Sequence, residues 1–125
     1  MKILVIDDSD LERSLLIEVL KGSGISNEFL QAKNGDEAIE FLGRNYKDIC
    51  LMLLDWQMPQ MSGMEFMESV IKVVDVSAIP IVMVTASGTE ENKKKAYGVN
   101  PKLGGYVIKP YDPDGLVKTI KPYLK

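Results

Sequence analysis

Five short apolar segments, each followed by a segment of helical periodicity, constrain the fold of this chain more than any other feature. They lie at 2–6, 28–32, 49–54, 81–85 and 105–109. Most are nearly continuous runs of aliphatic, often β-branched residues, which is typical of strands buried on both faces of a parallel sheet. Because parallel strands need right-handed helical crossovers, the pattern predicts a doubly wound α/β fold with five strands and five helices.

Helix-starting residues occur where this alternation requires them. Ser9 and Glu12 have the spacing of a capping box and predict a helix that ends at Gly22. Its inward stripe is expected to be Leu11, Leu15, Val19 and Leu20. The other helices are expected over 34–45 with Ala38, Ile39 and Leu42 inward, over 63–74 after a Ser62 cap, near 89–97, and from Pro113 after an Asp112 cap.

Several classes of protein are excluded by what the sequence lacks. With 125 residues, the chain is expected to form one domain over 1–125. It has no histidine and only one cysteine, Cys50, so it has no Ser-His-Asp triad, imidazole metal site or internal disulfide, and a reducing, cytoplasmic setting fits. No apolar run reaches a membrane span of about 20 residues. The net charge of −3 argues against nonspecific nucleic-acid binding.

Polar residues gather at the carboxyl ends of four predicted strands. Asp7 and Asp8 follow the first strand and Asp55 the third, Thr85 ends the fourth, and Lys109 ends the fifth. In an open parallel sheet, ligands bind beyond this edge, so we expect these side chains to form one site. The increase in side-chain length from Thr85 to Lys109 fits strands that lie progressively farther from Asp55, at about 4.8 Å per strand.

Three carboxylates in one site repel each other, and one lysine leaves the repulsion only partly compensated. Each pair costs about 4 kcal/mol at 4 Å and an effective dielectric near 20. A divalent cation with oxygen ligands relieves this repulsion, and Mg²⁺ suits a site with few protein ligands that keeps its waters. The sequence therefore predicts Mg²⁺ at this edge.

At this point the chain resembles, over its full length, the receiver domain of two-component response regulators, the flavodoxin-like phosphoacceptor family, and within it the stand-alone chemotaxis regulators. The resemblance rests on "DD" at 7–8, "DWQMPQMSG" at 55–63, Thr85–Ala86 and Lys109–Pro110. It implies the strand order 2-1-3-4-5 and a cis peptide at Lys109–Pro110. It also implies a signalling switch that catalyses only its own phosphorylation and dephosphorylation.

The resemblance assigns a role to each site residue. Asp55 would accept a phosphoryl group, and Asp8, Asp55 and the Gln57 backbone carbonyl would hold Mg²⁺, with Asp7 bound through a water. Lys109 would neutralise phosphoryl oxygens, Thr85 would bond to the phosphate, and Tyr106 would be the aromatic switch. The implied partners are a sensor histidine kinase or histidine phosphotransfer protein and a downstream effector, which would bind the surface of the fourth helix, fifth strand and fifth helix.

Three other functions fit the sequence less well. A small Mg²⁺-dependent aspartate-nucleophile phosphohydrolase would want a second aspartate two residues after Asp55, where Gln57 stands. A flavodoxin-like cofactor binder would need a phosphate-binding loop after the first strand, where acids stand instead. A receiver-like binding module that is never phosphorylated would not need the complete set of site residues.

One segment departs from the family pattern, and another has two interpretations. Residues 98–105, with Asn100-Pro101 and Gly104-Gly105, are expected to form an extended loop. The Lys93–Lys95 run is either a solvated face or a docking patch. No effector domain follows Lys125, which fits a stand-alone receiver or one excised from a longer protein.

Overall fold

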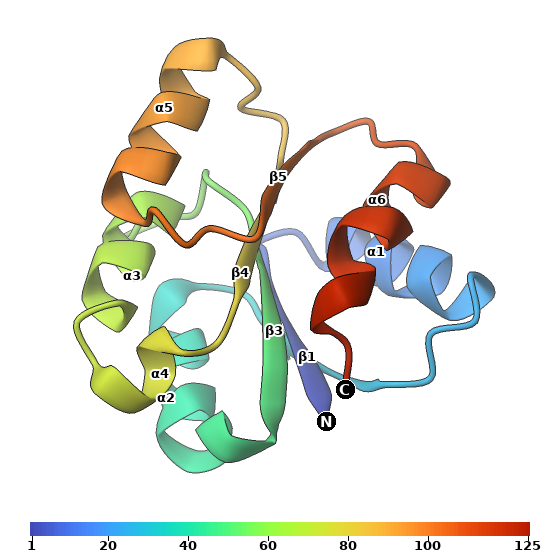
Figure 1. The fold of residues 1–125 in the computed structure, drawn as a ribbon, viewed down its shortest axis with the longest axis horizontal. Coiled ribbons are helices and arrows are strands. Elements are labelled where there is room, and N and C mark those ends of the chain that lie inside the picture. Colours follow the sequence, from blue (N-terminus) through green and yellow to red (C-terminus); the bar gives the residue numbers. More distant parts are fainter.

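The computed structural model describes residues 1–125 and contains a five-stranded parallel sheet with helices on both faces (Figure 1). The strand order is β2-β1-β3-β4-β5, as predicted. The strands are β1 (Lys2–Ile6), β2 (Glu28–Ala32), β3 (Ile49–Leu54), β4 (Ile81–Thr85) and β5 (Gly105–Ile108). Four strands have their predicted bounds, and β5 ends one residue early, before Lys109.

The helices form two layers around this sheet. They are α1 (Asp10–Gly22), α2 (Gly35–Asn45), α3 (Gly63–Val70), α4 (Val74–Ser77), α5 (Glu90–Val99) and α6 (Pro113–Ile120), with single 3₁₀ turns at Tyr46–Asp48 and Lys121–Tyr123. Figure 1 shows α1 and α6 on one face and α2 to α5 on the other. None of these helices combines the length and the apolar character needed to cross a membrane.

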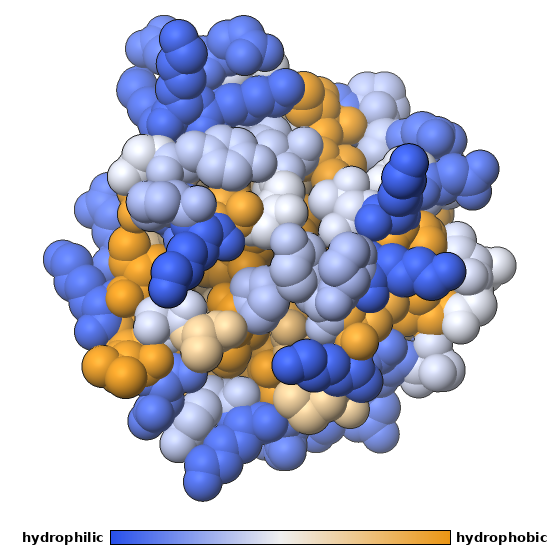
Figure 2. All heavy atoms as spheres, in the orientation of Figure 1, coloured by the Kyte–Doolittle hydropathy of each residue, from blue (hydrophilic) through white to orange (hydrophobic).

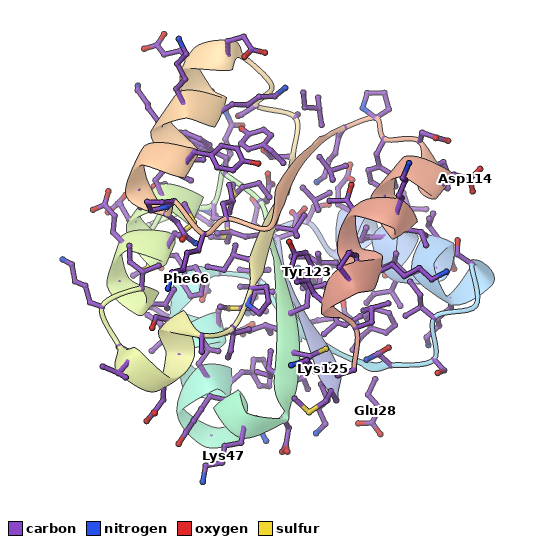
Figure 3. All side chains as sticks on the ribbon, viewed as in Figure 1. Glu28, Lys47, Phe66, Asp114, Tyr123 and Lys125 are labelled. Carbon is purple, nitrogen blue, oxygen red and sulfur yellow. The ribbon has the colours of Figure 1, made fainter.

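The sheet separates two hydrophobic cores. Phe66 of α3 is fully buried in the core beneath α2, α3 and α5, whereas Tyr123 packs against the core beneath α1 and α6 (Figure 3). Residues of β3 enter both cores, and all six are buried. The central strand is therefore held from both sides up to the residue before Asp55.

The predicted inward stripe of α1 is wrong in part. Leu20 is buried, but Leu11 and Leu15 are 68% and 45% exposed. The buried face is instead Arg13, Leu16, Ile17 and Leu20, which has helical spacing. Arg13 can be buried because its guanidinium donates to the carbonyl oxygen of Asp7 and to the side chains of Asp10 and Gln31.

The helices on the other face also differ from the prediction. Ile39 of α2 is 40% exposed, although Ala38 and Leu42 are buried as expected. The helix predicted over 63–74 ends at Val70, and a separate single turn, α4, begins at Val74. The β-branched residues Val73 and Val74 disfavour a continuous helix.

This break in the helix leaves apolar surface uncovered. A cavity of ≈ 390 Å³ opens between α2, α3 and α4. Beside it, Val73 and Val74 are 50% and 84% exposed, and Figure 2 shows hydrophobic groups at the surface where α4 lies in Figure 1.

The extended loop expected over 98–105 is not present. Helix α5 continues to Val99, and residues 100–104 form a compact connection in which Asn100 and Leu103 are buried. The Asn100 side chain accepts from the Lys102 backbone, and the Gly104 N–H donates to the carbonyl of Ile81. These bonds fix the path of the chain into β5.

The two chain ends lie side by side at the pole opposite the carboxyl ends of the strands (Figure 1). The Asn27 side-chain amide donates to the carbonyl oxygens of both Met1 and Lys125, each at 3.0 Å.

Candidate functional site

The register of the central strands brings the predicted site residues together. Ile6 of β1 pairs with Leu54 of β3, and the Asp55 N–H donates to the carbonyl of Ile6 at 3.0 Å. Asp7 and Asp55 therefore leave neighbouring strands at the same level. On the other side of β3, the Lys109 N–H donates to the carbonyl of Thr85.

Three carboxylates meet at this edge. Asp7, Asp8 and Asp55 each offer an oxygen atom, and these atoms lie within 4.8 Å of one another. Asp7 is buried, Asp55 is half-buried and Asp8 is exposed. Carboxylate oxygens at this spacing, with one side open to solvent, fit a hard divalent cation that retains part of its water shell.

The carboxylate of Asp55 is held in an environment that disfavours its charge. One oxygen accepts the Trp56 backbone N–H at 2.8 Å. Burial and the charge of Asp7 raise the pKa of Asp55, and they outweigh the Thr85 hydroxyl and Lys109, which lower it. A positive charge brought to this carboxylate would remove that penalty.

Lys109 reaches the cluster, but it forms ion pairs with Asp7 and Glu12 and not with Asp55. Its ammonium lies 2.8 Å from Asp7 Oδ2 and 3.5 Å from Glu12 Oε2. Burial alone would lower the pKa of Lys109, but Asp7, Asp55 and Glu12 outweigh burial and raise it, so the ammonium stays charged. The peptide bond between Lys109 and Pro110 is cis, as the resemblance implied.

A second set of contacts connects the site to Tyr106. The buried Thr85 hydroxyl oxygen accepts from the Ser87 N–H at 3.3 Å and from the Trp56 N–H at 3.4 Å. The Tyr106 hydroxyl donates to the Ser87 carbonyl. Burial and the nearby Asp55 charge raise the pKa of Tyr106, so the phenol stays neutral and keeps its proton to donate.

The loop after Asp55 forms one wall of the site. Gln57 is exposed, and with Asp8 it lines an open cavity of ≈ 460 Å³. The Gly63 N–H closes the loop by donating to the Trp56 carbonyl at 2.7 Å. A Cβ atom at Gly63 would lie 2.3 Å from the Asp55 carbonyl oxygen, so only glycine fits there.

Two residues near the site were not predicted as part of it. The Arg13 guanidinium donates to the Asp7 carbonyl oxygen, and Glu12 forms an ion pair with Lys109. A charged residue is seldom buried, so no sequence motif marks Arg13, although its helical spacing to Leu16, Ile17 and Leu20 puts it on the same face of α1. Glu12 was interpreted only as a capping residue.

Comparisons with known proteins agree with this geometry. The profile of the response regulator receiver domain matches residues 3–121. A chemotaxis protein CheY homolog of Campylobacter jejuni is 33% identical over 126 residues, which cover 99% of this chain and 92% of the relative. The phosphate regulon transcriptional regulatory protein PhoB of Escherichia coli is 32% identical, and the chain spans 52% of its length.

Solved structures show the same fold. A putative response regulator from Chloroflexus aurantiacus superposes with a TM-score of 0.87 at 28% identity, covering 98% of this chain and 96% of that one. Because the profile match and the relatives extend over nearly the whole sequence, the chain belongs to the response regulator receiver domain family.

Proposed function

We propose that this receiver domain accepts a phosphoryl group on Asp55 from a phosphohistidine of a sensor kinase or histidine phosphotransfer protein. The strongest support is the half-buried carboxylate of Asp55 beside Asp7 and Asp8, with Lys109 next to them, at an open sheet edge. These 125 residues contain no histidine, so the donor histidine lies outside them.

The reaction depends on Mg²⁺ in this proposal. Asp8, Asp55 and the Gln57 backbone carbonyl would hold the cation, with Asp7 bound through a water. The carboxylate oxygens of Asp7, Asp8 and Asp55, which lie within 4.8 Å of one another, support the part of this assignment that concerns the acids. When bound, the cation supplies positive charge for the phosphoryl oxygens.

Asp55 acts as the nucleophile. Its free carboxylate oxygen forms the O–P bond while the P–N bond of the donor breaks, and the leaving imidazole takes the electron pair. The Trp56 N–H bond fixes the other oxygen and so orients the carboxylate. Lys109 then compensates charge on the phosphoryl oxygens.

The signal passes through Thr85 and Tyr106. Thr85 can turn its hydroxyl from the Trp56 and Ser87 amides to a phosphoryl oxygen on Asp55. This shift would disturb the Ser87 segment to which Tyr106 is bonded, and so change the surface of α5, β5 and α6 for an effector protein. Two states of similar energy are required for such a switch.

Dephosphorylation should be slow to moderate. The water that attacks the acyl phosphate would pass between Gln57 and Ser87, and neither side chain is a strong base. Gln57 can orient the water because its amide both donates and accepts.

Intact-protein mass spectrometry with acetyl phosphate and Mg²⁺ tests the proposal. One phosphoryl mass should appear in the parent and be absent from Asp55→Asn. Asp48→Asn, at an exposed acid before the other end of β3, is the matched control and should be phosphorylated normally. Stoichiometric labelling of Asp55→Asn would refute Asp55 as the acceptor, and turnover of many equivalents of donor without accumulation would favour a phosphohydrolase.

A further inference from the structure

Glu12 forms only half of the capping box that its sequence position predicts. Its N–H donates to Ser9 Oγ at 3.1 Å, but the Ser9 N–H donates to Asp7 Oδ1 at 2.9 Å and not to Glu12. In α3 both halves form, because Glu65 Oε1 accepts the Ser62 N–H. The Glu12 carboxylate is therefore free for another partner.

That partner is Lys109. The ammonium lies between Asp7 Oδ2 at 2.8 Å and Glu12 Oε2 at 3.5 Å. Its side chain is 16% exposed, that of Asp7 is 9% exposed and that of Glu12 is 45% exposed. Lys109 thus bridges an acid inside the cluster and an acid on its rim.

The buried carboxylate of Asp7 cannot bind both the Lys109 ammonium and a divalent cation without repulsion between them. A divalent ion among Asp7, Asp8 and Asp55 would repel the ammonium that now lies on Asp7. Lys109 is mostly buried, so it keeps a carboxylate partner only if one is already within reach. Outside the cluster, Glu12 is the acid with which Lys109 forms an ion pair.

We propose, building on the function proposed above, that Glu12 is a positioning residue for Lys109. It retains the ammonium at the edge of the site when Asp7 turns to the cation, and so lowers the cost of binding the cation. Glu12 itself contacts neither the cation nor the phosphoryl group.

Magnesium titrations of the full chain test this role, read by Trp56 fluorescence and by the thermal midpoint. Glu12→Gln should raise the Mg²⁺ dissociation constant about threefold to fivefold, as expected for a partly exposed ion pair. Glu12→Asp should raise the dissociation constant in the same way. It keeps the charge, but its side chain is about 1.5 Å shorter, so its carboxylate no longer reaches Lys109. Glu65→Gln removes the charge of a capping glutamate but keeps an oxygen that can accept the Ser62 N–H, and it should leave the dissociation constant unchanged.

A double-mutant cycle separates the contact from general electrostatics. In a Lys109→Met background, Glu12→Asp should no longer weaken Mg²⁺ binding. Parental affinity in Glu12→Gln, or in Glu12→Asp alone, would overturn the proposal and leave the proposed function intact. A parent that binds no Mg²⁺ in either readout would overturn both.

Discussion

Replacing Asp55 with asparagine should stabilise the metal-free protein at neutral pH, although it removes the proposed phosphoacceptor. Asparagine has nearly the same shape, and its side-chain oxygen can still accept the Trp56 N–H that Asp55 accepts at 2.8 Å. The main change is the loss of one negative charge from the cluster.

The size of the effect follows from the geometry of the three acids. Asp7 is buried, and at 4.8 Å, the upper limit for the separation of these oxygens, its repulsion of Asp55 is about 3.5 kcal/mol for an effective dielectric near 20. Asp8 is exposed, and water reduces its share to about 0.9 kcal/mol at the same distance. Because Lys109 offsets much of the Asp7 charge, we expect a net gain of about 1–2 kcal/mol. For a chain of this length that is a rise in thermal midpoint of roughly 3–8 °C.

The pH dependence of stability gives a second test of whether Asp55→Asn stabilises the protein. The pKa of Asp55 is raised in the folded protein, so ionisation of this group destabilises the fold as pH rises through the folded pKa. Urea unfolding followed by circular dichroism should therefore show the Asp55→Asn advantage at pH 7, and the advantage should shrink as pH falls toward 4. Asp48→Asn should show no such advantage, since Asp48 is exposed and outside the cluster. A variant no more stable than the parent at pH 7 would refute the electrostatic reasoning.

The remaining predictions concern the cation, the loop and the switch. Asp8→Ala should abolish the rise in thermal midpoint with Mg²⁺, which at a hundred times the dissociation constant corresponds to about 2.7 kcal/mol in the parent; a midpoint that still rises would remove Asp8 from the cation site. Gly63→Ala should destabilise the protein by about 1–3 kcal/mol in urea, because its Cβ would meet the Asp55 carbonyl at 2.3 Å; an unchanged urea midpoint would show that the loop yields easily. Thr85→Ala should leave Asp55 able to accept phosphate but abolish phosphorylation-dependent changes in amide exchange at Tyr106, and persistence of those changes would place the switch elsewhere.

The central strand was predictable because its sequence is a continuous run of apolar residues. The run "ICLMLL" is apolar throughout and buried throughout, so its continuous apolar character and its short length define it as a strand. The buried face of α1 was predicted less well, because the expected stripe of Leu11, Leu15, Val19 and Leu20 does not include Arg13. Tertiary hydrogen bonds decided that position, and a single-sequence pattern does not contain them.

At the site, the meeting of Asp7, Asp8 and Asp55 was predictable because these acids directly follow β1 and β3, and parallel strands end at one edge. The resting partner of Lys109 was not predictable. The length of the Lys109 side chain does not determine which of several nearby carboxylates it pairs with. The partner depends on how buried each carboxylate is and on which ones already accept other hydrogen bonds.

The bonds from Asn27 to both chain ends have a practical consequence for engineering. Met1 and Lys125 are tied to one side chain, so a short peptide joining them should allow circular permutation with new ends in an exposed turn. Lys125 lies near Glu28 at the start of β2, far along the strands from the acids (Figure 3). Without permutation, a fluorescent reporter or immobilisation tag fused at Met1 or Lys125 would leave the acidic edge and the α5 surface open to incoming proteins.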